Sequence, residues 1–298
     1  MISVCIPVYN QFVQELVHEL VKQAQEIHTT AEILLVDDGS EIGYKEKNRQ
    51  LSHLEGVYYH EFEQNKGRIA ARNALAAQAV NDWLLFIDSD SQITSKHYIK
   101  DYISLCTAET DAIFGGRVYS AEPPSSCNKT LHWKYGRQRE RNRGSHTVFM
   151  TNNFCIRKTI FQELDFPHQI EGYGHEDTWL GIELKKRNAP CRFIQNAVLH
   201  NGVEEAGIFI EKSINALKNL LALQTVVEKD DLKKHVRLYR FYCFQKKLGL
   251  GTLLLQLDKL VHAKLLTNLY SCSPSLLLFD LYRLMLLVRL SRERTTVK

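Results

Sequence analysis

The sequence predicts an α/β protein with a mostly parallel central sheet, because short apolar runs alternate with helical patterns through its first half. Ser3–Val8 is rich in residues that favour strands, and Phe12–Ile27 follows it with apolar residues four apart, as one face of a helix requires. Further strands are expected at Ile33–Val36, Val57–Phe62, Trp83–Ile87 and Ala112–Gly116, with a helix at Gly67–Val80. Alternating strands and helices place helices on both faces of such a sheet.

The second half of the sequence is expected to become helical. A helix is predicted from about Glu176 to Arg187 and a strand over Cys191–Leu199, whereas Glu122–Ser126 and Lys134–Arg143 have the composition of loops. From about residue 204 the pattern is helical, and leucines at helical spacing mark one apolar face after Leu250. We therefore expect a catalytic domain at residues 1–225 and a helical, basic C-terminal extension at 226–298.

Composition limits the classes of protein to consider. The chain has 298 residues, of which 44% are hydrophobic, and this is enough for a full α/β core. Its seven cysteines are odd in number and have no CxxC spacing, so neither a disulfide framework nor a zinc site is predicted. No basic stretch with an apolar run follows Met1, and we expect a cytoplasmic protein in a reducing compartment.

The positive charge is concentrated in the tail. Residues 229–298 contain 14 Lys and Arg against 5 Asp and Glu, whereas the rest of the chain has 24 against 29. Pro274–Leu290 is apolar but is short for a membrane span and carries three charged side chains. It is expected to be an interfacial helix at the inner face of the membrane, or a helix that packs on the catalytic domain or on a second subunit of a homodimer.

Two acidic clusters follow predicted strands, and ligands of parallel sheets bind beyond the carboxyl ends of the strands. In Asp88-Ser89-Asp90 an extended backbone would point both carboxylates the same way, one to a ribose hydroxyl and one to a divalent metal. In Asp37-Asp38-Gly39-Ser40 only one carboxylate is expected to enter the cleft, and the other to fix the loop. Acidic residues that only cap strands and turns are the alternative interpretation of each cluster.

Taken together, the motifs resemble those of the family 2 glycosyltransferases of GT-A fold, and in particular bacterial enzymes of capsular or surface polysaccharide synthesis. The matching segments, in order, are Ile6-Pro7-Val8-Tyr9-Asn10, Val36-Asp37-Asp38-Gly39-Ser40, Asn65-Lys66-Gly67, Ala71-Arg72-Asn73, Asp88-Ser89-Asp90, Tyr173-Gly174-His175-Glu176-Asp177 and Leu199-His200. The resemblance fades beyond about residue 225. It implies a GT-A nucleotide-diphospho-sugar transferase fold for the catalytic domain.

The resemblance also implies roles for individual residues. The donor nucleotide sugar, UDP-linked by expectation, would be bound by Pro7, Val8, Tyr9, Asp38, Gly67, Arg72, Asp88 and Ser89. Asp90 would bind Mn²⁺ or Mg²⁺ together with His200, because a carboxylate and a neutral imidazole are both suitable ligands. Asp177 would be the general base of an inverting transfer and Glu176 would orient a substrate, although simple capping of the helix start also explains this acidic pair.

The expected reaction is hexosyl or N-acetylhexosaminyl transfer to a hydroxyl of a saccharide or lipid-linked saccharide. Trp133, Arg137 and His175 are candidate contacts for the acceptor or for a loop that closes over the donor, since arginine forks match phosphate oxygens and aromatic rings stack on sugars. A solvated loop around Lys134, Arg139, Arg141 and Arg143 is the alternative.

Other enzyme classes fit the sequence less well. A haloacid dehalogenase-like phosphatase or phosphotransferase could use Asp88 as its nucleophile, but its motif belongs near the start of the domain. A sugar nucleotidyltransferase would need a Gly-rich, Arg-bearing loop in place of Pro7-Val8-Tyr9-Asn10. No GxGxxG follows the first strand, which disfavours a dinucleotide dehydrogenase, and no RNA-binding signature supports nucleic acid as a partner.

Overall fold

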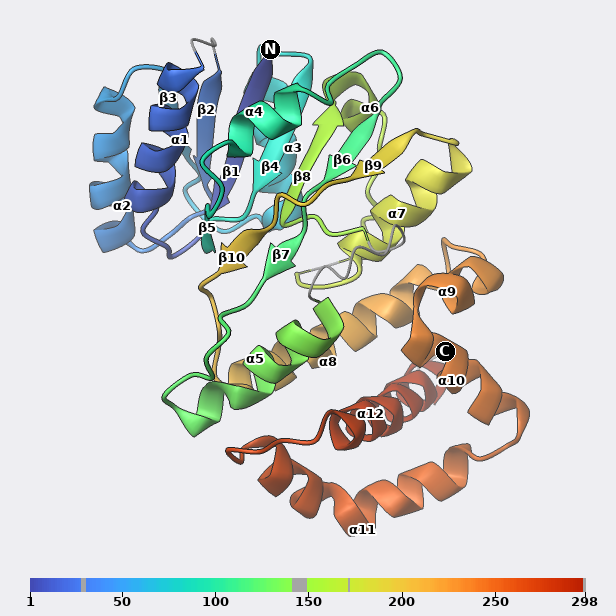
Figure 1. Cartoon of the computed structure of the whole chain (residues 1–298). Helices are drawn as coiled ribbons and strands as arrows, with labels where there is room; N and C mark the ends of the chain where they lie inside the picture. Colours follow the sequence, from blue (N-terminus) through green and yellow to red (C-terminus); the bar gives the residue numbers. More distant parts are fainter. Residues whose placement is uncertain (28–30, 141–148, 171, 297–298) are drawn as a thin grey trace. The chain divides into compact units, whose positions relative to one another are not determined.

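The computed structural model describes residues 1–27, 31–140, 149–170 and 172–296, and the contacts among them divide the chain into two compact units (Figure 1). The first unit consists of residues 1–120, 141–165 and 183–202, and the second of residues 121–140, 166–182 and 203–298. The second unit thus takes in two segments from the middle of the chain as well as residues on both sides of position 225. The functional division at residue 225 stays a prediction.

A seven-stranded sheet forms the centre of the first unit, with the order β3-β2-β1-β4-β8-β6-β9 among its described strands (Figure 1). The strands are β1 (Ile2–Val8), β2 (Glu32–Asp37), β3 (Val57–Glu61), β4 (Trp83–Ile87), β6 (Ala112–Phe114), β8 (Asn153–Arg157) and β9 (Cys191–Phe193). Of these, β8 runs antiparallel to both of its neighbours, and the other pairings are parallel. The predicted α/β class with a mostly parallel sheet is confirmed.

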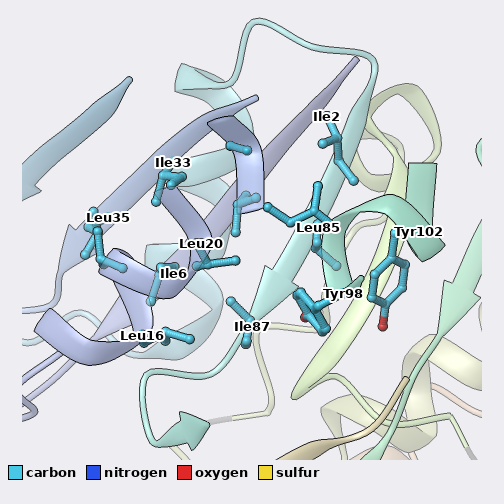
Figure 2. Packing of buried hydrophobic residues seen from close by; sticks show 14 of the residues in the cluster. Ile2, Ile6, Leu16, Leu20, Ile33, Leu35, Leu85, Ile87, Tyr98 and Tyr102 are labelled. Carbon is cyan, nitrogen blue, oxygen red and sulfur yellow. The ribbon is translucent and has the colours of Figure 1, made fainter. Parts of the chain in front are cut away.

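Both faces of this sheet are buried, as the strand composition requires. On one face Ile6, Leu35 and Ile87 pack against Leu16 and Leu20 of α1 (Gln14–Glu26), next to α4 (Tyr98–Ile103), as Figure 2 shows. Helix α3 (Arg68–Gln78) contacts β1 and β2. Because each fully buried large apolar side chain contributes about 1.5–3 kcal/mol, this core fixes the register of the strands.

A second, three-stranded sheet lies in the first unit, with the order β5-β10-β7. Its strands are β5 (Ser91–Gln92), β7 (Arg117–Val118) and β10 (Val198–His200). The single strand predicted over Cys191–Leu199 is therefore wrong, because the chain leaves the main sheet after β9 and joins the small sheet at β10. Elements that were not predicted are α2 (Ile42–Arg49), the 3₁₀ helix η1 (Gln50–His53), α6 (Lys158–Gln162) and the strand β8.

The described part of the second unit is helical. It contains the 3₁₀ helix η2 (Cys127–Lys129), α5 (Thr130–Tyr135), the π-helix η3 (Gly136–Glu140), the first part of α7 (Glu176–Lys186), α8 (Ala206–Leu223), α9 (Lys229–His235), α10 (Arg237–Lys247), α11 (Gly251–Leu269) and α12 (Leu276–Thr296). The loop predicted from Lys134 is wrong up to Glu140, since polar and basic residues there continue α5 as a π-helical turn. Arg141 and Arg143 lie outside the described residues.

Aromatic side chains form the core of the second unit. The ring of Phe209 on α8 stacks on His132 of α5, with centroids 4.4 Å apart, and lies 5.6 Å from Phe279 of α12. Phe279 is fully buried, and Tyr135 meets it edge-on at 5.8 Å. Helix α12 is therefore a packed helix, which was one of the two expectations for this segment. Among the described helices, none combines the length and the hydropathy that a membrane span needs.

A disulfide bond joins Cys127 to Cys272 within the second unit. The prediction that the cysteines form no disulfide is therefore wrong. The two residues are 145 positions apart, and cysteine number and local spacing carry no information about a contact at that range. The bond connects the segment before α5 to the turn between α11 and α12.

The disulfide should stabilise the second unit, because it closes a long loop and so restricts the unfolded chain. We expect reduction with dithiothreitol to lower the unfolding free energy by about 2–4 kcal/mol, measured as a lower thermal midpoint. Both cysteines are exposed, so the reductant has access to them. The variant in which Cys127 and Cys272 are both serine should show the lower midpoint with and without reductant. An equal midpoint in all four samples would show that the bond does not contribute.

Candidate functional site

The two carboxylates of the first acidic pair, Asp37 and Asp38, accept hydrogen bonds from different segments of the chain. Asp37 accepts hydrogen bonds from Ser40 N at 2.7 Å and from the Tyr59 hydroxyl at 3.0 Å, and it is fully buried. Asp38 accepts the amides of Lys66 and Gly67 at 2.7 and 2.9 Å. Asp37 therefore fixes its own loop, as was expected for one member of the pair. The other member, Asp38, fastens the loop that leads into α3.

Burial raises the pKa of Asp38, and the two backbone hydrogen bonds partly offset this effect. The amide of Asp38 donates to Val8 O at 2.8 Å, so the end of β1 and the Asp38 turn are adjacent. Val8 is buried at this edge and Tyr9 is 52% exposed. The structure thus brings together Pro7, Val8, Tyr9, Asp38 and Gly67 at the carboxyl ends of β1 and β2.

Asp88-Ser89-Asp90 forms a turn instead of an extended segment. Ser91 N donates to Asp88 O at 3.1 Å, which closes the turn after β4. The expectation that both carboxylates point the same way from an extended backbone is therefore wrong. The turn gives each aspartate its own partners.

Asp88 faces the positive charges of α3. The Arg72 guanidinium donates to Asp88 Oδ1 at 3.2 Å and to Thr151 O at 2.6 Å, and it is 2% exposed. Arg68 Nη1 lies 3.9 Å from Asp88 Oδ2. Because a buried guanidinium needs a compensating charge, Arg72 holds Asp88 in place. Arg68 was not predicted, and no spacing in the sequence distinguishes it.

Asp90 meets His200 because β5 begins at the next residue and pairs with β10. Ser91 is opposite His200 in the antiparallel register, and Asn201 N donates to Asp90 O at 2.9 Å. The His200 Nδ1 atom lies 3.3 Å from Asp90 Oδ1, with the imidazole buried and the aspartate 32% exposed. The structure therefore brings the two predicted metal ligands together from positions 110 residues apart in the sequence.

The surroundings of Asp90 favour its ionised form. Burial alone would raise the pKa of this carboxyl, but the hydrogen bond with His200 and the charges of His200, Arg117 and Arg68 lower it well below the ordinary value. A carboxylate that stays ionised with one side exposed is suited to bind a cation. Arg117, on β7, contributes to this field.

Gly202 packs closely against these two side chains. A Cβ atom on Gly202 would lie 2.5 Å from Asp90 Oδ2 and 3.0 Å from His200 Cε1, so only glycine fits. Among the described residues no group of three or more His, Cys, Asp or Glu side chains could hold a metal. The protein therefore offers a partly exposed carboxylate and an imidazole next to each other. This set fits a divalent cation that takes its remaining ligands from a diphosphate and water.

The predicted catalytic acids lie at the start of α7 in the second unit. Glu176 is buried, and its Oε2 accepts a hydrogen bond from Gly174 N at 2.9 Å. Gly174 has a φ of 105°, and a Cβ there would lie 2.6 Å from Ala216 Cβ. Asp177 is half-buried in the first helical turn, where the helix dipole favours a carboxylate. Glu176 thus closes the tight turn, and Asp177 is the more accessible of the two.

The other acceptor candidates also belong to the second unit. The Arg137 guanidinium lies 5.3 Å from the Trp133 ring centroid and donates to Ala121 O. His175 Nδ1 is 3.1 Å from Thr178 Oγ1, so the imidazole contacts a side chain of the first turn of α7. These contacts give each side chain a structural role, and their part in binding an acceptor stays a prediction.

Comparison with known proteins identifies the family. The model of "Glycosyl transferase family 2" matches residues 3–165, which are more than half of the chain. The chain belongs to glycosyl transferase family 2. This confirms the resemblance seen in the sequence and sets aside a phosphatase that would use Asp88. No curated protein matches the sequence of this glycosyltransferase.

Solved structures of similar fold are glycosyltransferases of the GT-A type. S. aureus TarS 1-349 in complex with UDP has a TM-score of 0.52 at 20% identity, over 84% of this chain and 74% of that one. Glucosyl-3-phosphoglycerate synthase from Mycobacterium tuberculosis, in complex with Mn²⁺, UDP and glucosyl-3-phosphoglycerate, has a TM-score of 0.51 at 16% identity, over 76% and 79%. The predicted GT-A fold is confirmed.

A third similar structure is the mannosyltransferase PcManGT from Pyrobaculum calidifontis in complex with GDP-Man and Mn²⁺. Its TM-score is 0.51 at 11% identity, over 75% of this chain and 64% of that one. The family 2 chain described here therefore spans less than two thirds of the mannosyltransferase. At these identities the likeness concerns the fold.

The environment of His175 predicts a pH dependence of stability. Burial, with Arg283 nearby, lowers the pKa of His175 from 6.5 to about 4, although Glu176 opposes the shift. Below pH 6.5 the His175 imidazole of the unfolded chain becomes protonated, whereas that of the folded chain stays neutral until the pH falls to about 4. Acidification over this range should therefore lower the unfolding free energy, by about 1.4 kcal/mol per unit for this group.

The measurement is urea unfolding of the wild type and of His175→Asn between pH 7 and 4. Asparagine tolerates the left-handed φ of 72° at this position and does not titrate, so the variant should lose less stability on acidification. His53→Asn, at an exposed site, is the matched control and should follow the wild type. Parallel curves for the wild type and His175→Asn would contradict the buried neutral imidazole.

Proposed function

We propose that this glycosyltransferase moves a hexosyl or N-acetylhexosaminyl group from a UDP-sugar to a hydroxyl of a saccharide acceptor, with inversion, in the synthesis of a surface polysaccharide. The observation that carries the proposal is the pair of Asp90 and His200 beside the turn that holds Asp88. Membership of family 2 and the solved neighbours with UDP, GDP-Man and Mn²⁺ support a nucleotide-sugar donor.

The residues at the carboxyl ends of β1, β2 and β4 would bind the nucleotide. Asp88 has carboxylate lone pairs beyond those used by Arg72, and ribose hydroxyls are donors that can use them. Arg68, which is partly exposed, is placed to attract the diphosphate. Pro7, Val8, Tyr9 and Asp38 form the adjacent strand-end surface on which we propose that the uracil lies.

Asp90 and His200 would hold a divalent cation, Mn²⁺ or Mg²⁺. When bound, this cation supplies positive charge to the diphosphate leaving group. Its effect is large, since two unit charges 4 Å apart interact by about 4 kcal/mol at an effective dielectric constant near 20. The Asp90 side chain is 32% exposed, and its basic neighbours keep the carboxylate ionised without a metal.

Asp177 would act as the general base. Its carboxylate takes the proton of the acceptor hydroxyl while the oxygen forms a bond to the anomeric carbon, and the bond from that carbon to the diphosphate breaks on the opposite side. This single displacement inverts the anomeric centre. Glu176 would contribute by fixing the turn at Gly174 that presents Asp177.

The second unit also carries a surface suited to peripheral membrane contact, which we propose as the cellular setting of the enzyme. Phe241, Phe244 and Leu253 on α10 and α11 are 49%, 60% and 61% exposed, and the basic residues Lys246 and Lys247 lie in the last turn of α10. Apolar side chains next to positive charge suit the anionic inner leaflet. The apolar residues of α12 from Met285 to Val288 are buried, whereas Leu277 at its start is 77% exposed, so most of this helix would not take part in the contact.

The metal site is tested by Asp90→Asn. We expect this variant to lose transfer from UDP-sugars by about 10²–10³-fold, because an amide cannot offset the charge of the cation. Binding of Mn²⁺ in the presence of UDP, followed by electron paramagnetic resonance, should weaken as well. Asp230→Asn is the control, because Asp230 is exposed and pairs only locally with Lys233. Undiminished Mn²⁺ binding by Asp90→Asn would remove Asp90 from the metal site.

The base is tested by Asp177→Asn. We expect kcat to fall by about 10²–10⁴-fold while the affinity for UDP and Mn²⁺ stays unchanged. The acid limb of the pH–rate profile, which reports protonation of the base, should disappear in the residual activity. Glu183→Gln provides a matched control on the same helix, where Glu183 pairs with Lys186 at 3.3 Å. A wild-type pH profile and rate for Asp177→Asn would show that another group accepts the proton.

A further inference from the structure

The second unit contains a cavity of about 610 Å³ that the donor site does not use. Its described walls come from α5 and η3, from the turn before α7 and the first turn of α7, and from α8, α9, α10 and α12, all within this unit. Cavities of about 300–1,000 Å³ are the size that binds small organic ligands. The cavity therefore has room for one or two sugar or polyol units.

The cavity opens at the turn that carries the proposed base. His175 and Thr178 both line it, and they lie on either side of Glu176 and Asp177 in the sequence. The contact between His175 Nδ1 and Thr178 Oγ1 holds the two lining side chains together. A molecule in this cavity would thus meet the first turn of α7, which also carries Asp177, although Asp177 is not one of the lining residues.

Positive charge exceeds negative charge along the walls. Three arginines, Arg139, Arg237 and Arg283, face two acids, Glu140 and Asp280. Asp280 is shared, since it accepts from Arg139 at 2.8 Å and also from Arg283. The imidazole of His175 is neutral near pH 7 because its pKa is low. The lining therefore has an uncompensated positive charge.

The arginines of the cavity differ in what they already bind. Arg283 is 17% exposed and donates to the Tyr135 hydroxyl at 3.1 Å as well as to Asp280, while its Nε has no hydrogen-bond partner among the described residues. Arg237 forms no ion pair with any described acidic side chain, and its guanidinium lies 5.6 Å from the Phe241 ring centroid. Arg237, exposed at the rim, is thus the cation most available to a ligand.

Aromatic side chains complete the lining. Tyr135, Tyr173, Phe209 and Phe241 contribute rings to the walls, and such rings pack on the apolar faces of sugars. Arginine guanidinium groups match the oxygens of phosphate with two parallel hydrogen bonds. An unpaired guanidinium next to aromatic rings indicates a ligand that joins a phosphate to a sugar or polyol.

We propose that this cavity is the acceptor site and that the acceptor carries a phosphate group, bound by Arg237, next to the sugar or polyol whose hydroxyl is glycosylated. The proposal rests on the proposed function, because Asp177, the proposed base, directly precedes the lining residue Thr178 in the first turn of α7. The phosphate can belong to a soluble or polymeric sugar phosphate or to a lipid-linked saccharide. The same guanidinium chemistry recognises either source.

The test is isothermal titration calorimetry of the full chain without donor, at fixed ionic strength. Glucose 1-phosphate should bind at least about tenfold more tightly than glucose, and Arg237→Gln should remove about tenfold of that affinity, the loss of one charge-assisted hydrogen bond. Arg240→Gln, one turn later on α10 and outside the lining, is the matched control and should bind as the wild type does.

Each outcome bears on the proposal. Tighter binding of glucose 1-phosphate than of farnesyl diphosphate would support a sugar phosphate acceptor, and the reverse order would support a lipid-linked one. Equal affinity for glucose and glucose 1-phosphate, or equal losses in Arg237→Gln and Arg240→Gln, would overturn it. Hydrolysis of UDP-sugars by the wild type is measured in parallel. Its absence would reject the proposed function separately from phosphate binding.

Discussion

The pairing of β5 with β10 is the interaction on which the donor site depends. Two residues of β5 follow the Asp88–Asp90 turn immediately, and their antiparallel register places His200 beside Asp90. The core of the large sheet holds β4 in place, and the small sheet holds β5 and β10, so Asp90 lies in a turn between two fixed strands and His200 lies on a third. A shift of one residue in this pairing would turn His200 to the other face. The positions of Asp90 and His200 are thus set by backbone hydrogen bonds as well as by side-chain contacts.

Much of the donor site could be predicted because its determinants are local. Asp38 and Asp88 each follow an apolar strand directly, and parallel strands bring their carboxyl ends to one edge. Gly39 has a φ of 76°, and a Cβ atom there would clash with the backbone of Gln64, so the tight turn requires glycine. The glycine therefore indicates the turn in the sequence. Strand, turn and acid lie within a few residues of each other, and sequence pattern is informative at that range.

What could not be predicted depends on contacts between distant segments. Strand β8 lies antiparallel between β4 and β6, and both partner strands are more than 30 residues away from it in the sequence. The residues of β8, Asn153–Arg157, do not by themselves specify the direction of the strand. The turn at Asp88-Ser89-Asp90 is set by Arg72 and by β10. Residues from Lys134 to Glu140 were predicted to be part of a loop, but Tyr135 packs its ring against Phe209 and Phe279, which outweighs weak helix propensity.

The two units differ in whether acidic or basic side chains are available to a ligand. In the first, arginines compensate aspartates that must stay ionised, so the acids remain ready for a cation and for hydroxyl donors. In the second, Asp280 compensates two arginines at once and leaves Arg237 at the rim without a described ion-pair partner. A buried pair is costly to break, whereas a rim guanidinium can exchange water for a ligand at little cost. Arg283 therefore shapes the cavity, and Arg237 is the side chain that can select what enters it.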